Sequence, residues 1–304
     1  MLLFIVNGLA ISAQDTLKTV MVSTYHDKSL VKEKTVDENK MHYFVNACDK
    51  TSFISLTEED NFSLVMNEAF SPQNILLFVH GDDFDLEKLA IRGADFPDLY
   101  NINTILFAWQ SYRISHNSIK NYNNSKKNAD LSFPYFLQLV DSIKNYAMKH
   151  QVKASVIFHS LGNIFAQKYA LFLEDNPDTQ QPFTNIILNS ACVPAKDHVR
   201  WVDILCQKAS NKVYVTVNKN DNILLLASTF IEHQHLLGRK IGRKTSQNAY
   251  YIDFTDILRN VSSDKKMPSS HTYFISYPPR ENPEIKKFYN TLFHSNLYQD
   301  HYEK

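Results

Sequence analysis

The chain has 304 residues, which is long for one hydrophobic core and short for two full ones, so we expect a single domain. Lysine and arginine total 32 residues, and aspartate and glutamate also total 32. The formal net charge is therefore zero, which removes the electrostatic argument for nucleic acid or an anionic membrane surface as a partner. Apolar residues make up 44% of the chain, so a large core can form, and we expect a small molecule as the partner.

The apolar stretch at residues 1–13 is too short to span a bilayer and ends in small residues before Gln14. It resembles a secretory signal peptide, which predicts a periplasmic or extracellular mature chain, residues 14–304, without stable membrane insertion. Because no lysine or arginine precedes the apolar run, the alternative is an ordinary buried strand in a cytoplasmic protein.

Three short segments that are rich in Val, Phe, Tyr and Thr predict antiparallel edge strands, at residues 18–25, 42–48 and 52–56. Beyond residue 74 the pattern changes to unbroken apolar runs of strand length, which predict parallel strands buried on both faces. These runs are residues 75–79, 104–109, 154–158, 185–188 and 213–217.

Segments of helical period alternate with these strands, at residues 86–99, 133–148, 164–173, 197–208 and 223–237. The alternation predicts an α/β fold with a doubly wound, mostly parallel sheet that is flanked by helices and carries antiparallel N-terminal strands. The connection at residues 110–131 is too long and too polar for a plain turn, so it is either a cap over a site or a solvated surface segment.

One buried strand runs directly into His159-Ser160-Leu161-Gly162-Asn163 and then into a helix. Strand, serine, glycine and helix form the order of a nucleophile elbow, in which a tight turn exposes the serine oxygen. The amide of Leu161, close to the N-terminus of the helix, can then face an oxyanion. Gly162 permits the close approach that this turn requires. The motif therefore predicts Ser160 as a nucleophile.

A second strand ends in His80-Gly81, where the following loop supplies the other oxyanion amide in enzymes with such an elbow. By position, that amide belongs to Asp82. A His-Gly pair alone is also compatible with a simple turn, but the chain has only six glycines, and Gly81 and Gly162 each follow an apolar strand directly. Together the two glycines favour a catalytic site.

The acid and the base of such a site follow the nucleophile in that order along the chain. Asp221 comes shortly after a buried strand, at the edge of the sheet where α/β proteins bind their ligands. Its local sequence is also typical of a turn or a helix cap, and Asp253 and Asp256 are rivals for the acid.

For the base we predict His271, in a loop after the last expected strand at residues 250–254. The other histidines downstream of the nucleophile fall mostly within helical patterns, where a surface or boundary role is ordinary. The candidates among them are His198, His233, His235 and His294.

No metal site or cofactor is expected. His233 and His235 are two residues apart, so they do not share a helix face. The three cysteines, Cys48, Cys192 and Cys206, are an odd number without metal-like spacing, which favours neither a zinc site nor a disulfide framework.

With these motifs the chain resembles the α/β-hydrolase superfamily, and within it a poorly characterised bacterial family with an HSMGN-type nucleophile elbow. The elbow corresponds to residues 159–163, and the downstream Asn220-Asp221 turn and Ser270-His271-Thr272-Tyr273 segment also match. The resemblance covers residues 74–273 and implies a hydrolase fold with a Ser-His-Asp triad.

Two features depart from the usual pattern. The position two before the nucleophile is usually Gly or Ala, and here Phe158 predicts a somewhat relaxed elbow. Asp82 and Asp83 place carboxylates beside the expected oxyanion hole, where they would oppose its negative charge. We therefore expect a serine hydrolase of small acyl esters. The alternatives are a non-catalytic binding or scaffold protein of this fold, or an acyltransferase or thioesterase with the same triad.

Overall fold

The structure, a computed structural model, describes residues 19–24, 42–46, 54–55, 66, 70, 72–84, 86–111, 115–177, 181–263 and 268–294. The segment interpreted as a signal peptide, residues 1–13, lies outside these ranges, as does Cys48. Across the described part of the chain, no helix combines the length and the apolar character needed to cross a bilayer.

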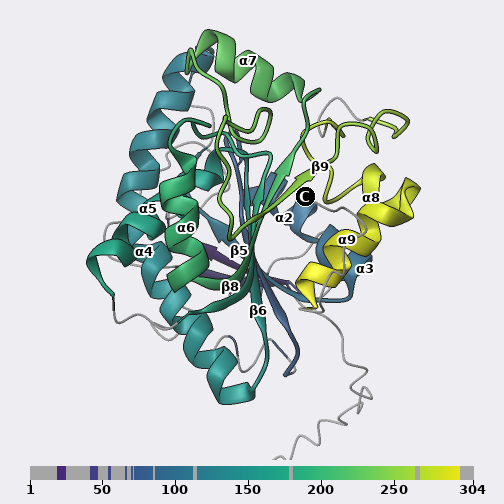
Figure 1. The fold of residues 1–304 in the computed structure, drawn as a ribbon. Helices are drawn as coiled ribbons and strands as arrows, with labels where there is room; N and C mark the ends of the chain where they lie inside the picture. The colour runs from purple at the N-terminus through teal and green to yellow at the C-terminus, as the bar shows by residue number, and fades with distance from the viewer. Residues whose placement is uncertain are drawn as a thin grey trace, which may run out of the picture.

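The described residues form one sheet with the strand order β3-β2-β1-β5-β4-β6-β7-β8-β9 (Figure 1). Along the run β1-β5-β4-β6-β7-β8-β9 each strand is parallel to the next, which confirms the predicted mostly parallel sheet. The strands are β1 (Thr19–Ser23), β2 (His42–Asn46), β3 (Ile54–Ser55), β4 (Ile75–Val79), β5 (Asn103–Ala108), β6 (Ala154–His159), β7 (Phe183–Asn189), β8 (Ser210–Val217) and β9 (Tyr250–Asp253).

Strand β1 is not an edge strand, contrary to the interpretation of residues 18–25. It lies between β2, to which it is antiparallel, and β5, to which it is parallel, and all five of its residues are buried. Strand β2 is also antiparallel to β3.

Helices cover both faces of the sheet (Figure 1). One face carries α4 (Ser118–His150), α5 (Asn163–Asp175) and α6 (His198–Lys208). The opposite face carries α2 (Leu86–Gly93), α3 (Asp95–Tyr100), α8 (Tyr277–Glu281) and α9 (Pro283–Phe293). Helix α7 (Asn222–Phe230) lies at the upper end of the view, beyond the carboxyl end of β8.

The unbroken apolar runs have a direct physical explanation in this arrangement. Successive strand residues point to opposite faces, and in β4 Leu77 packs into one core whereas Leu76 and Phe78 pack into the other. Burying each such side chain is worth about 1.5–3 kcal/mol, so both faces of the central strands stabilise the fold.

Helix α4 begins at Ser118, well before the expected start at residue 133, so most of the segment at residues 110–131 belongs to its first turns. Its N-cap, Asn117, accepts a hydrogen bond from the amide of Lys120 (2.9 Å). The buried face of these turns is largely polar, with Asn121, Ser125 and Asn128 at helical spacing. A search for apolar periodicity therefore misses this part of the helix.

Candidate active site

Ser160 lies at the carboxyl end of β6, in the short 3₁₀ turn η1 (Ser160–Gly162) that leads into α5. Its φ of 52° is in the left-handed region, which costs a non-glycine residue about 1–2 kcal/mol. Strand β6 pairs with β4 and β7, so this strained serine is central in the sheet. The tight turn predicted from the motif is present.

Buried hydrogen bonds hold the elbow in this conformation. The Asn163 side chain donates to the carbonyls of Phe158 (2.9 Å) and Ser160 (3.0 Å), and the Cys192 amide donates to the carbonyl of Ser160 (3.0 Å). The turn keeps its left-handed φ at Ser160 beside Phe158, whose ring is buried in the core against Phe136, with 5.8 Å between centroids. Sequence reasoning included Asn163 in the motif without assigning it this role.

The two glycines singled out in the sequence meet at the elbow. A Cβ on Gly162 would lie 2.5 Å from the carbonyl oxygen of His80, at the end of β4, so only glycine fits. A Cβ on Gly81 would lie 2.7 Å from Cβ and 3.2 Å from Oγ of Ser160. The loop after β4 therefore lies directly against the Ser160 side chain.

His271 and Asp221 form a buried pair, with 2.7 Å between Nδ1 and Oδ2. The other carboxylate oxygen of Asp221 accepts the amide of Leu224 (2.9 Å), so the residue also caps α7. Both roles considered for Asp221 are thus compatible. The rival carboxylates form ion pairs elsewhere, Asp253 with Lys219 and Asp256 with Arg259.

The loop that carries His271 is anchored to the ends of two strands. The Ser190 hydroxyl donates to the carbonyl of His271 (2.7 Å), and the Asn218 side chain donates to the carbonyl of Ser270 (2.6 Å). Sequence reasoning missed Ser190 and gave Asn218 no anchoring role. Their position directly after β7 and β8, at the edge where ligands bind, was the available signal.

His271 also packs against His159, the residue before Ser160, with 4.8 Å between ring centroids. Burial lowers the pKa of His159, and the nearby His271 lowers it further, so His159 stays neutral beside its neighbour. This contact brings the His271–Asp221 pair to the elbow.

The other downstream histidines have different partners. His198 contacts the carbonyl of Ala195 and the hydroxyl of Tyr251, both at 2.8 Å, and His294 contacts the carbonyl of Tyr100 at 2.7 Å. His235 lies 3.1 Å from the Lys240 ammonium, and His233 is exposed. Within the ranges that the structure describes, no three His, Cys, Asp or Glu residues are grouped to hold a metal ion.

The first turns of α4 line the same edge of the sheet. The Ser125 hydroxyl donates to the Asp82 carboxylate (2.6 Å), and Lys126 pairs with Glu232 (2.9 Å). One turn earlier, Tyr122 lies 3.5 Å from the sulfur of Cys192. Burial raises the pKa of the Cys192 thiol to about 12, so it is protonated at neutral pH.

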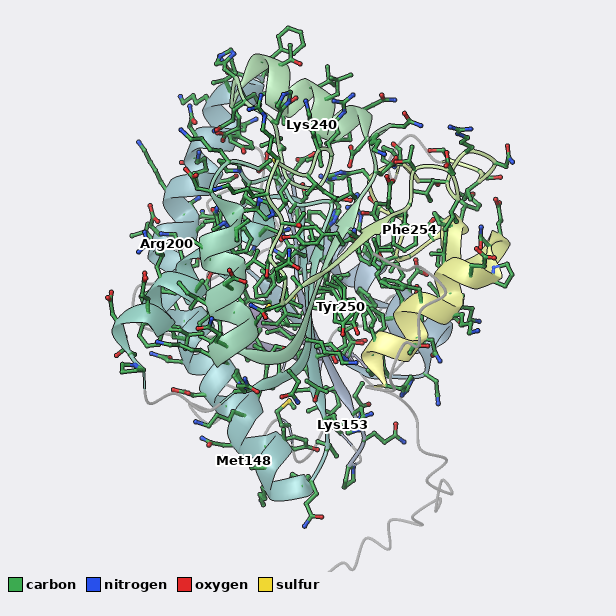
Figure 2. The ribbon with its side chains drawn as sticks, viewed as in Figure 1. Met148, Lys153, Arg200, Lys240, Tyr250 and Phe254 are labelled. Atoms are coloured by element: carbon green, nitrogen blue, oxygen red, sulfur yellow. The ribbon has the colours of Figure 1, made fainter. Side chains whose placement is uncertain are left out.

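Figure 2 labels residues near both ends of the strands. Lys153, directly before β6, lies at the lower end of the view, whereas Phe254, directly after β9, and Lys240 lie higher. The elbow follows β6 and Asp221 follows β8, and the His271 loop is hydrogen-bonded to the residues directly after β7 and β8, so all three lie at the carboxyl edge of the sheet.

A protein-family model described as an alpha/beta hydrolase of unknown function (DUF900) matches residues 57–284. The matched range contains every candidate site residue, from His80 to His271. No curated protein and no solved structure matches the chain.

Proposed function

Since the chain belongs to this α/β-hydrolase family, we propose that it is a serine hydrolase that cleaves small acyl esters through an acyl-enzyme. The observation that carries the proposal is the strained turn at Ser160, with the buried His271–Asp221 pair packed beside it through His159. Strain at a buried serine that follows a central strand is typical of a nucleophile held ready for attack.

In the proposed mechanism Ser160 attacks the ester carbonyl while His271 takes its proton at Nε2. In this mechanism Nδ1–H of His271 donates a hydrogen bond to the Asp221 carboxylate, which leaves the lone pair of Nε2 available as the base. The same imidazolium then protonates the leaving alkoxide, and a water molecule, activated in turn by His271, hydrolyses the acyl-enzyme. These residues perform the reaction without a cofactor.

The amides of Leu161 and Asp82 are the proposed donors to the oxyanion. Leu161 follows the nucleophile and is close to the N-terminus of α5, where backbone amides favour negative charge. Gly81 is in contact range of Ser160, so in this proposal the Asp82 amide approaches the oxyanion from the loop after β4. The hydrogen bond from Ser125 holds the Asp82 carboxylate toward α4, which reduces the expected conflict with the oxyanion.

Short acyl chains are the expected substrates, because the α4 side chains that contact the loops at this edge, Tyr122, Ser125 and Lys126, are not aliphatic. Each buried methylene is worth about 0.8 kcal/mol, and this gain should end after a few carbons. We expect kcat/KM on p-nitrophenyl esters to peak at acetate to butyrate and to fall for long chains. Transfer of the acyl group to an alcohol and cleavage of thioesters would use the same residues. Rates with an added alcohol acceptor and with thioester substrates are therefore compared with the rate of ester hydrolysis.

The second candidate function is hydrolysis of lipid esters at an interface, which the exposed apolar residues of α7 favour. Ile223, Leu226 and Phe230 are 41%, 54% and 62% exposed on the helix that Asp221 caps. The test is the rate of hydrolysis of a long-chain ester above its solubility limit. If the rate jumps there, and the jump is lost in Leu226→Ser but kept in Leu171→Ser, the short-chain proposal is contradicted. Leu171 is a matched control, 50% exposed on α5.

A further inference from the structure

The loop after β4 is fixed by two donors that converge on one carbonyl oxygen. The Ser111 hydroxyl donates to the carbonyl of Gly81 (2.9 Å), and Nδ1 of His80 lies 2.8 Å from the same oxygen. Both side chains are buried, at 1% exposure each. Two buried groups that contact one carbonyl oxygen restrict the orientation of this peptide.

The tautomer of His80 follows from its other ring nitrogen. The amide of Trp109 donates to Nε2 (3.2 Å), so Nε2 is the acceptor, and Nδ1 carries the proton that is donated to Gly81. The indole of Trp109 donates to the carbonyl of His80 (2.9 Å), and the two rings stack with 5.3 Å between centroids. Trp109, directly after β5, thereby fixes the position of His80 at the end of β4.

Ser111 contacts the rest of the loop as well. Its carbonyl accepts the amide of Asp83 (2.7 Å), and its hydroxyl oxygen accepts the amide of Phe84 (3.3 Å). One buried serine, just beyond the end of β5, therefore binds the loop at three residues, Gly81, Asp83 and Phe84.

The direction of the Asp82 amide follows from this network. The structure contains no cis peptide bond among its described residues, and in a trans peptide the C=O and N–H bonds point in opposite directions. Because the carbonyl of Gly81 points to Ser111 and His80, the N–H of Asp82 points away from them. Gly81 itself lies against Ser160, so the Gly81–Asp82 peptide is next to the nucleophile.

We propose that Ser111 is a positioning residue that orients the Asp82 amide for the oxyanion, with His80 and Trp109 as its supports. This inference rests on the proposed serine-hydrolase function. Ser111 does not touch the substrate; it acts through the Gly81–Asp82 peptide. Its effect should therefore be confined to the transition state, where negative charge develops.

The test is Ser111→Ala, measured on a short p-nitrophenyl ester and with a short alkyl trifluoromethyl ketone, whose adduct with the serine carries an oxyanion. We expect kcat to fall about 10- to 100-fold, somewhat less than for loss of a direct donor, with little change in KM. Affinity for the ketone should fall by a similar factor. Ser111→Thr, which keeps the hydroxyl, should restore most of both.

Ser155→Ala is the matched control, because Ser155 is a buried serine of β6 that donates to the carbonyl of Leu292 (3.1 Å), away from the site. It should lose a similar amount of stability and keep kcat. If Ser111→Ala matches Ser155→Ala in kcat, the positioning role is wrong while the proposed function stands. If wild type neither turns over esters nor binds the ketone, both are wrong. Should Ser111→Ala not fold, Ser111→Cys, which fills the space but donates weakly, is compared in the same way.

Discussion

Replacing His271 with alanine is expected to lower kcat on a short ester by about 10⁴- to 10⁶-fold, because no other group then takes the proton of Ser160. KM should change little, since the imidazole acts on the nucleophile rather than on the bound acyl chain. The measurement is the steady-state rate on p-nitrophenyl acetate, together with the melting temperature of the variant.

The matched control for His271 is His233→Ala, which removes an exposed imidazole downstream of the nucleophile. It should keep full activity. A His271→Ala variant that is folded and retains more than about one tenth of wild-type kcat would assign the base to another residue.

Asp221→Asn is expected to lower kcat by about 10⁴-fold through a change of tautomer. The asparagine oxygen can still cap α7 through the amide of Leu224, so the fold should be kept. Its NH₂ group, however, faces Nδ1 of His271 in place of the acceptor oxygen that is 2.7 Å away in the native pair. Nδ1 must then accept, Nε2 must carry the proton, and the base can no longer accept from Ser160.

Asp253→Asn and Asp256→Asn are the controls for this prediction. Their carboxylates pair with Lys219 and Arg259 on the surface, and such exposed pairs contribute little to stability. Both variants should keep wild-type kcat. A neutral effect of Asp221→Asn beside a severe effect of Asp253→Asn would move the acid to Asp253.

The central strands were predictable because their residues are apolar on both faces. The run at residues 75–79 coincides with β4, and the run at 154–158 falls one residue short of the end of β6. The start of α4 was not predictable from apolar periodicity, since tertiary contacts bury its polar residues Asn121 and Ser125. The expected helix at residues 223–237 ends earlier, at Phe230, because buried Leu236 pairs with Pro194 in a β-bridge instead.

In the site, local motifs identified the residues whose spacing along the chain is characteristic. The elbow around Ser160 and the glycine at position 81 have such signatures, and the structure brings them into contact. Ser111 and Ser190 have none, because each acts through one hydroxyl on a distant carbonyl, 30 and 81 residues away in sequence. The position of Ser190 directly after β7 was an available signal, but only the fold shows which carbonyls the two hydroxyls bind. The catalytic roles themselves stay predictions.

Labelling with a fluorophosphonate followed by peptide mapping tests the central claim most directly, because this reagent reacts with serines that a neighbouring base has activated. The expected result is one covalent adduct per chain, on Ser160, formed at neutral pH and lost in Ser160→Ala and His271→Ala. Folded wild-type protein that stays unlabelled, or that carries its adduct on a different serine such as Ser190, would contradict the assignment of Ser160 as the nucleophile.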